Sequence, residues 1–130
     1  MSAEVLAAAD HLVEVFGQHD ADAYFACFAE DATFVFYNHP VRLESRAAWE
    51  ALWHEWEAEG FRVLGCRSTG RLVQMLSDGT AVFSHSVETE ATIAGETSIS
   101  HERETIVFNR VDGHWLAVHE HLSPTTEREA

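Results

Sequence analysis

The second half of the chain alternates apolar and polar residues with a period of two, which is the pattern of half-buried β-strands. The alternation begins at Phe61 and is divided by three turn signals, Ser-Asp-Gly at 77–79, Ala-Gly-Glu at 94–96 and Val-Asp-Gly at 111–113. Because short turns connect antiparallel neighbours, this half predicts four long strands in a meander. Such a sheet has one apolar face that the rest of the chain must cover.

The first half of the chain supplies helices that can cover this face. Apolar residues recur at helical spacing over 2–17, with Ser2 suited to the N-cap and Gly17 to the stop. Residues 20–31 repeat this period briefly, residues 32–37 are aromatic and β-branched enough for a strand, and Ser45 can cap a helix over 46–60. Helices followed by an antiparallel meander predict an α+β domain whose sheet bends around its N-terminal helices.

Three tryptophans of the segment 46–60 fall on one helical face, together with Leu52. Trp49, Trp53 and Trp56 are therefore expected to face the core. An indole N–H is costly to bury without a polar partner, so part of this stripe can line a cavity instead.

Length and composition predict one acidic domain. The chain has 130 residues, 46% of them hydrophobic, which is enough for a single core. We expect a domain over residues 1–122 and a flexible tail over 123–130. With 22 acidic and 8 basic residues the formal net charge is -14, which repels phosphate backbones and anionic lipid, so no nucleic acid and no membrane is expected as a partner.

The cysteines and the N-terminal residues predict a cytoplasmic protein. Cys27 and Cys66 are isolated in the sequence, which argues against a disulfide framework and against a zinc ribbon. The first ten residues carry an acid where a secretory signal needs positive charge, and no apolar run reaches the roughly 18 residues of a membrane span.

The register of the last hairpin decides which side chains share a face, and two registers fit the sequence. A three-residue loop with Gly113 in the left-handed conformation places Glu104 opposite Glu120, on the same face as Phe108. A two-residue Asp-Gly turn instead places Glu104 opposite His121. The first register separates apolar from polar residues more cleanly, so it is preferred.

In the preferred register His119 and His121 lie on the outer face of the sheet, and His85 and His101 join them if the Ala-Gly-Glu turn also has three residues. Two histidines two residues apart on a strand do face the same way, which suits a metal. However, His85 and His119 would be two strand spacings apart, roughly 9 to 10 Å, too far for one ion. We therefore expect no metal and no cofactor. We expect instead a homodimer through this outer face around Val107, Ala117 and His119.

The preferred register also places two like charges on the core face. Glu104 opposite Glu120 destabilises a sheet unless the two carboxyls share a proton or an arginine such as Arg67 or Arg71 lies between them. Such a pair is tolerated at functional sites, and it is also tolerated at a solvated rim. If the pair is buried, the pKa of one carboxyl must rise.

The order of elements and the last motif resemble the nuclear transport factor 2-like superfamily, specifically its SnoaL-like branch. Residues 18–34 are similar to the segment with which those proteins leave helix one and enter strand one. The stretch from Glu104 to Ser123 is similar to the end of the association domain of calcium/calmodulin-dependent protein kinase II. The residues that carry this similarity are Thr105, Asp112, Gly113, Trp115, Val118, His119, His121 and Ser123.

The resemblance implies a cone, in which a strongly curved sheet surrounds the helices, a pocket opens at one end and the outer face forms dimers. The pocket arginines of the kinase association domain fall on Ile106 and Leu122, so the resemblance does not imply an anionic ligand here. The catalytic tyrosine and aspartate of ketosteroid isomerases fall on Leu12 and Phe36, so it does not imply steroid isomerisation either.

Three functions fit these observations. The first is a pocket for a small, largely apolar molecule, in which Glu104 and Glu120 act as acid and base in proton transfer of the isomerase, cyclase or dehydratase type. The second is a non-catalytic association module that dimerises through its histidine face, and the third, weaker one is a metal-dependent hydrolase using those histidines. The residues expected to line the pocket are Tyr24, Phe28, Phe36, Trp53 and Phe108.

Overall fold

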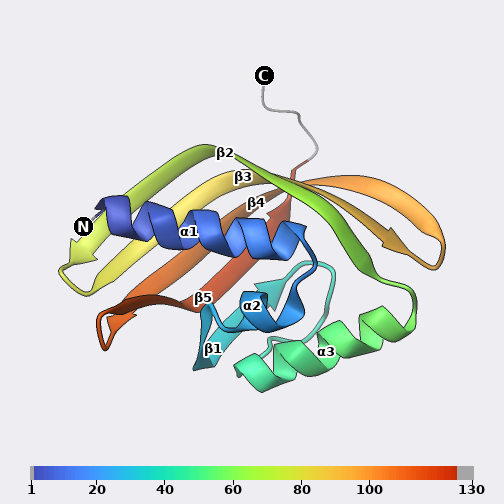
Figure 1. Cartoon of the computed structure of the whole chain (residues 1–130), viewed down its shortest axis with the longest axis horizontal. Helices are drawn as coiled ribbons and strands as arrows, with labels where there is room; N and C mark the ends of the chain where they lie inside the picture. Colours follow the sequence, from blue (N-terminus) through green and yellow to red (C-terminus); the bar gives the residue numbers. More distant parts are fainter. Residues whose placement is uncertain (1, 126–130) are drawn as a thin grey trace.

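The computed structural model describes residues 2–125, in which N-terminal helices cover the concave face of a curved, five-stranded sheet (Figure 1). This confirms the predicted α+β class, the order of elements and the four-strand meander. The first strand begins at Phe28 rather than at residue 32. The elements are α1 (Ser2–Gly17), α2 (Ala21–Phe25), β1 (Phe28–Phe36), α3 (Arg46–Ala58), β2 (Arg62–Ser77), β3 (Thr80–Ile93), β4 (Glu96–Val111) and β5 (His114–Pro124).

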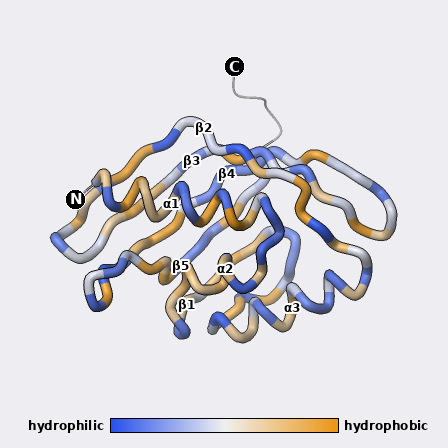
Figure 2. Tube along the Cα trace, viewed as in Figure 1, coloured by the Kyte–Doolittle hydropathy of each residue, from blue (hydrophilic) through white to orange (hydrophobic). Residues whose placement is uncertain are grey.

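The sheet is mixed because its first and last strands lie side by side. The strand order is β1-β5-β4-β3-β2, with β1 parallel to β5 and the other neighbours antiparallel. Hydrophobic and hydrophilic residues alternate along α1 and along the strands beneath it (Figure 2). The apolar sides of the two layers therefore face each other and form the core.

Helix α1 packs against the sheet through one stripe. Val5, Ala9, Leu12 and Val15 are all buried, at the spacing that places residues on one helical face. In α3 the three tryptophans of the predicted stripe have different surroundings. Trp53 is fully buried in the core, whereas Trp49 and Trp56 contribute to the wall of a cavity.

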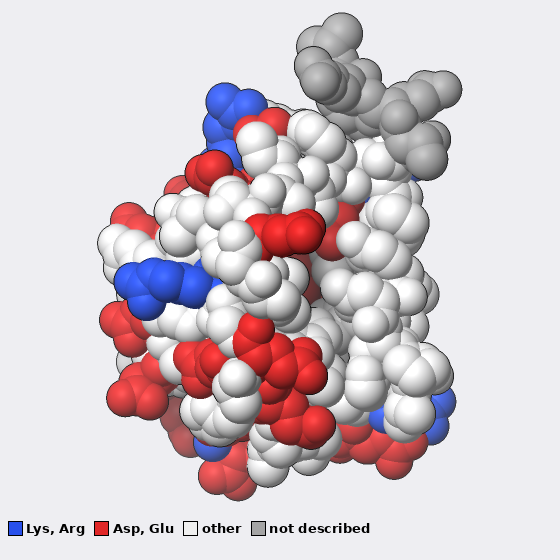
Figure 3. All heavy atoms as spheres, turned by 90° about the vertical axis from the view of Figure 1, so that its right-hand side faces the viewer, with Lys and Arg blue, Asp and Glu red and all other residues white. Residues whose placement is uncertain are grey.

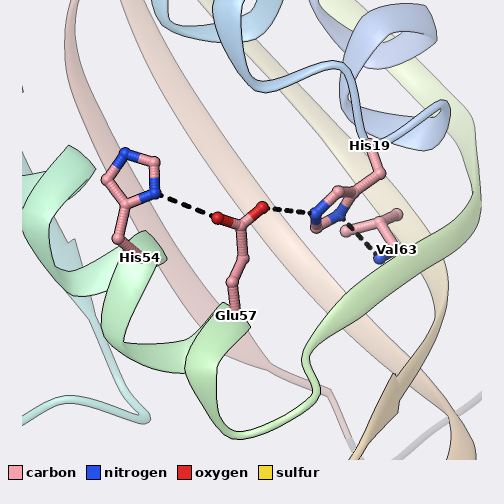
Figure 4. Close-up of polar contacts among 4 residues, drawn as sticks. All are labelled: His19, His54, Glu57 and Val63. Atoms are coloured by element: carbon pink, nitrogen blue, oxygen red, sulfur yellow. Dashed lines mark hydrogen bonds and ion pairs between the residues drawn. The ribbon is translucent and has the colours of Figure 1, made fainter.

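A histidine joins the three segments that close one end of the fold (Figure 4). His19, between α1 and α2, has a φ of 56°, a left-handed conformation that histidine adopts more readily than most residues. Its Nδ1 atom accepts the backbone N–H of Val63 at 2.9 Å, and its Nε2 atom lies 2.8 Å from Oε2 of Glu57. The ring also stacks on Trp53, with centroids 4.8 Å apart. These contacts tie the α1–α2 turn to α3 and β2.

The last hairpin shows that the preferred register was wrong and that the alternative holds only near the turn. The turn has two residues, Asp112 and Gly113, both with positive φ, as a type I′ turn requires. The two-residue register extends to Phe108 opposite Ala117. The next pair is Val107 and His119, so one residue of β5 forms a β-bulge.

The bulge decides which face Glu120 occupies. Beyond it, Ile106 pairs with Glu120 and Glu104 pairs with Leu122, so the two glutamates are diagonal neighbours rather than direct partners. Both still lie on the inner face. Without the extra residue, Ala117 and Glu120 would point to opposite faces, whereas both are buried.

Two predicted outer-face residues lie on the inner face instead. The β3–β4 turn also has two residues, so His85 pairs with Glu104 and its side chain is buried under the helices. Ala117 is fully buried because the two-residue turn reverses the predicted orientation near the start of β5. The predictions for His101, His119 and Val107 on the outer face agree with their registers.

Two further features concern the C-terminal end of the domain and the length of its helices. Strand β5 ends at Pro124, and residues 126–130 of the predicted tail lie outside the described residues. Within residues 2–125, no helix has the length and apolarity needed to cross a membrane.

Candidate functional site

A cavity of about 430 Å³ lies between the concave face of the sheet and the helices. Its apolar wall comes mostly from helices and from the end of β1, and its polar wall comes from β4 and β5. The C-terminal part of α3 and the β3–β4 hairpin, on the right in Figure 1, contribute Trp56, Ile93 and Ser98 to its wall. The apolar residues that argue for a binding site are Leu12, Phe16, Tyr24, Phe36, Trp49, Trp56 and Phe61.

Three glutamates form the polar wall. Glu102 and Glu104 are two residues apart on β4, so both side chains lie on the inner face of the sheet. Glu120 joins them from β5 because of the bulge. Among the described residues that line the cavity, none is an arginine or lysine. The wall therefore carries acidic groups whose charge no basic lining residue neutralises. Figure 3 shows the right-hand side of the molecule as drawn in Figure 1, where acidic side chains cover more of the surface than basic ones.

Glu104 is held by a buried imidazole. Oε1 of Glu104 lies 2.7 Å from Nε2 of His85, and Nδ1 of His85 lies 2.6 Å from the hydroxyl oxygen of Ser68. Burial alone would raise the pKa of Glu104, but the hydrogen bonds with Glu120 and His85, together with the charge of His85, hold it below its usual value. Glu104 is therefore the ionised member of the pair.

Glu120 shows the opposite behaviour. Burial, the charge of Glu104 and the hydrogen bond with Glu104 raise the pKa of Glu120 well above its usual value, and a hydrogen bond from Tyr24 opposes the rise. Its Oε1 atom is buried and has no hydrogen-bond partner among the described residues. The hydroxyl of Tyr24 accepts the indole N–H of Trp49 at 3.2 Å, which fixes its position. Two neighbouring carboxyls thus differ in protonation, with one proton shared between them.

The third glutamate lies closer to the surface. The hydroxyl of Tyr37 donates to Oε2 of Glu102 at 2.6 Å. Burial raises the pKa of Glu102, the hydrogen bond from Tyr37 opposes this rise, and the charge of Glu104 adds to it. Tyr37 is 46% exposed, so this pair lies at the boundary between the cavity and solvent.

A cysteine in the cavity wall is not a nucleophile at neutral pH. Burial raises the pKa of the Cys66 thiol to about 12, so the reactive thiolate is scarce. Burial also raises the pKa of Tyr24 and Tyr37, so the candidate acids and bases of this cavity are its glutamates.

The structure brings together some of the residues predicted for the site and separates others. Glu104, Glu120, Tyr24 and Phe36 all line the cavity. Phe28, Trp53 and Phe108 do not line it; each is buried in the core. Trp53, for example, stacks with the rings of His19 and Tyr24, so its side chain is enclosed in the core instead of facing the cavity.

The outer histidines do not converge on a site. His119 is held by the Thr33 hydroxyl, whose oxygen lies 2.8 Å from Nδ1, and His101 lies 3.7 Å from Glu88 across the neighbouring strand. Within residues 2–125, no group of three or more histidine, cysteine, aspartate or glutamate side chains is arranged to hold a metal.

Three functional candidates were missed by reasoning from the sequence, Ser68, Glu102 and Tyr37, and His85 was assigned to the outer face. The position of His85 depends on the β3–β4 register, which the Ala-Gly pair of that turn signals when it forms a two-residue type I′ loop. The contact of Ser68 with His85 depends on the pairing of β2 with β3. Glu102 shares the parity of Glu104 on β4, so the alternation itself could have identified it. Nothing in the sequence indicates that Tyr37 reaches it.

Comparison with known proteins agrees with this geometry. The family model described as a SnoaL-like domain matches residues 5–127. Among curated proteins, none matches the sequence significantly.

Solved structures similar to this chain carry several different descriptions. A candidate calcium/calmodulin-dependent protein kinase II association domain from Xanthomonas campestris has 22% identity, a TM-score of 0.81 and coverage of 98% of this chain and 90% of its own. A ketosteroid isomerase-like protein from Erwinia carotovora atroseptica has 15% identity, a TM-score of 0.81 and 96% coverage of both chains. A candidate scytalone dehydratase from Novosphingobium aromaticivorans has 16% identity, a TM-score of 0.81 and coverage of 96% and 84%. At these identities the similarity shows a shared fold.

Proposed function

Because this chain belongs to the SnoaL-like domain family, a branch of the nuclear transport factor 2-like superfamily, we propose that its cavity binds a small, largely apolar molecule and transfers a proton. The carboxyl pair of Glu104 and Glu120 carries the proposed chemistry. The family contains members of different activities, so the proposal rests on the residues of this cavity rather than on the fold.

The observation that carries the proposal is the opposite protonation of two adjacent carboxyls in the cavity wall. Glu104 has a lowered pKa and Glu120 a raised one. Two titratable groups whose environments push their pKa values apart are suited to act as base and acid at the same pH. The cost of burying two carboxyls on one sheet face is easier to explain at such a site than in an ordinary core.

The proposed reaction assigns one role to each carboxyl. Ionised Glu104, positioned by His85, takes a proton from a carbon next to the carbonyl group of the ligand. Protonated Glu120 donates its proton to the carbonyl oxygen, so a neutral enol forms and no charge is left on the ligand. Return of a proton to a different carbon isomerises the ligand, and return to the same carbon exchanges its hydrogen. The apolar wall, including Phe36 and Trp56, holds the hydrocarbon part.

Hydrogen exchange at carbon tests this function without knowledge of the natural ligand. The probe is 2-tetralone, an apolar ketone with acidic hydrogens beside its carbonyl, dissolved in deuterated buffer and followed by proton NMR. We expect the wild-type protein to accelerate loss of these signals, and Glu104→Gln to reduce the protein-dependent rate by at least about 100-fold. The matched control is Glu59→Gln, at an exposed glutamate outside the cavity wall, which should leave the rate unchanged. Equal rates in all three proteins would exclude proton transfer to such ketones.

We also propose a homodimer formed by the outer face of the sheet. Val82 and Val107 are direct partners on β3 and β4 and are half-buried on that face, with His119 beside Val107. Apolar residues in the middle of an otherwise uncovered sheet face favour a partner. If the protein shows no proton transfer, this face supports the alternative function of a non-catalytic association module.

A further inference from the structure

The buried Oε1 atom of Glu120 has no hydrogen-bond partner among the described residues, although its residue lines the cavity and is only 4% exposed. Buried polar atoms are nearly always hydrogen-bonded in folded proteins, so an exception beside a cavity indicates a contact that a ligand completes. Because this atom is a carboxyl oxygen, the group that completes it is a hydrogen-bond donor.

The charges around the cavity indicate what kind of donor this is. The wall holds Glu102, Glu104 and Glu120, and none of the described lining residues is basic. The imidazole of His85 lies behind Glu104 and is fully buried, so it does not reach the cavity space. The chain as a whole has a formal charge of -14, which attracts cations toward such an opening and repels anions.

Several arginines are engaged elsewhere and leave the glutamates without a cation. Arg67 pairs with Glu88 at 2.9 Å on the outer face, and Arg71 pairs with Asp10 of α1. These are the two arginines that the sequence suggests as neutralising partners of Glu104 and Glu120. Neither contributes to the cavity wall.

From this arrangement we infer that the ligand carries a protonated amine, whose N–H groups bind Glu120 and whose apolar body lies against the aromatic wall. This inference rests on the proposed binding of a small molecule in the cavity and not on the proposed proton transfer. An amine bound to ionised Glu120 displaces the proton that the reaction uses, so this ligand competes with a ketone substrate. An N–H group satisfies the free Oε1 atom, and its positive charge offsets the acidic wall. A hydroxyl would supply only the hydrogen bond, and a carboxylate would add another negative charge.

The aromatic residues of the cavity wall favour the same class of ligand. Phe16, Trp56 and Phe61 line the cavity, and Trp56 and Phe61 contact each other with ring centroids 5.5 Å apart. Aromatic faces attract cations as well as hydrocarbon. They therefore accommodate an ammonium group as it enters and the apolar body once the ammonium has reached the glutamates.

Binding of a cation should release a proton. In the free protein, burial and the neighbouring charges favour the protonated form of Glu120. An ammonium group favours the ionised form, so it replaces this proton and the apparent affinity should increase as the pH rises toward the pKa of the amine. The titratable groups that face Glu120 or lie next to its partners are Glu102 and Glu104 on β4, His85 on β3, Cys66 on β2 and Tyr24 on α2.

Three naphthalene compounds of nearly equal shape test the inference by isothermal titration calorimetry. They are 2-naphthylmethylamine, 2-naphthylmethanol and 2-naphthoate, which are cationic, neutral and anionic at neutral pH. We expect the amine to bind at least about tenfold more tightly than the alcohol, with the carboxylate weakest. In buffers of different ionisation enthalpy, the amine titration should show proton release and the alcohol titration should not.

The variants Glu120→Gln and Glu59→Gln separate the local contact from long-range attraction. Both remove one ionisable carboxyl group, but only the first alters the buried oxygen pair. Glu120→Gln should weaken amine binding at least about tenfold and alcohol binding less than about threefold, and Glu59→Gln should change neither by more than about threefold. Thermal unfolding of both variants confirms that they are folded.

Each other outcome overturns a definite part of the argument. If the alcohol binds as tightly as the amine, or Glu120→Gln weakens both equally, the cationic ligand is excluded while the apolar binding cavity stands. If the two variants weaken amine binding equally, only general attraction is present and the assigned contact is wrong. If none of the three compounds binds, both this inference and the proposed small-molecule function are overturned.

Discussion

The Nε2 atom of His85 lies 2.7 Å from Oε1 of Glu104, and the imidazole has no exposed surface. The two residues are direct partners on β3 and β4, so the pairing of the strands brings them together. A buried carboxylate needs such a partner because the cost of removing it from water is otherwise uncompensated.

Replacing this histidine should therefore be costly. His85→Leu removes the hydrogen bond to Glu104 and is expected to lower the free energy of unfolding by about 1–3 kcal/mol at neutral pH. The matched control is His114→Leu at an exposed position of β5, with an expected change within about 0.5 kcal/mol. Urea unfolding of both variants measures the difference, and equal losses would contradict the role of the buried pair.

The loss in His85→Leu should depend on pH with a definite sign. The folded-state pKa of Glu104 is lowered, so its ionised form contributes stability above the usual value of 4.5, and this contribution is lost as the pH falls through the folded-state pKa. The difference between wild type and His85→Leu should therefore be largest near neutral pH and become smaller below 4.5. A difference that grows on acidification would show that Glu104 is not the ionised member.

Glu120→Gln should have the opposite pH dependence. The folded-state pKa of Glu120 is raised, so the folded protein holds this proton more tightly than the unfolded chain does. That advantage is complete below the unfolded pKa and is lost as the pH rises through the folded pKa, at up to about 1.4 kcal/mol per pH unit. Glutamine does not titrate, so the variant should gain stability relative to wild type between pH 4.5 and pH 8. A flat difference across this range would show that Glu120 is not perturbed.

The two histidines that share Glu57 should differ in their contribution. The side chain of His19 is 8% exposed and also binds Val63, whereas the side chain of His54 is 64% exposed (Figure 4). His19→Asn is expected to cost about 2–4 kcal/mol, because two partly buried hydrogen bonds and a ring stack are lost. His54→Asn should cost within about 0.5 kcal/mol.

Asparagine suits both positions. It tolerates the left-handed backbone of His19, and its helix propensity is similar to that of histidine for His54. The measured difference therefore reports the side-chain contacts. Chemical denaturation at neutral pH makes the comparison, and equal effects would show that the contacts of His19 add nothing beyond an exposed ion pair.

The outer face can be tested by its oligomeric state. Wild-type protein at micromolar concentration should have the mass of a dimer by light scattering, and Val107→Asp should have the mass of a monomer, because a buried unpaired charge destabilises an interface. Val41→Asp is the control, since Val41 is 62% exposed in the loop after β1. A monomeric wild type would contradict the proposed dimer.

The order of elements could be predicted from the sequence because it depends on local patterns. Alternation from Phe61 onward and three glycine-containing turns specify the meander, and helical spacing of Val5, Ala9 and Leu12 specifies α1. These features need only neighbouring residues, and the structure agrees with each of them.

The faces of the strands could not be predicted in the same way, because one inserted residue reverses every side chain beyond it. The sequence of residues 117–119 in β5 is compatible with a regular strand and with a β-bulge, and no neighbouring residue favours one of these conformations. Packing decides between them, since the bulge buries Ala117 against the helices and still returns Glu120 to the cavity. The sequence by itself determined which strands form and in what order. Only the tertiary structure decided that His85, Glu104 and Glu120 meet, because their contacts depend on the exact pairing of three strands.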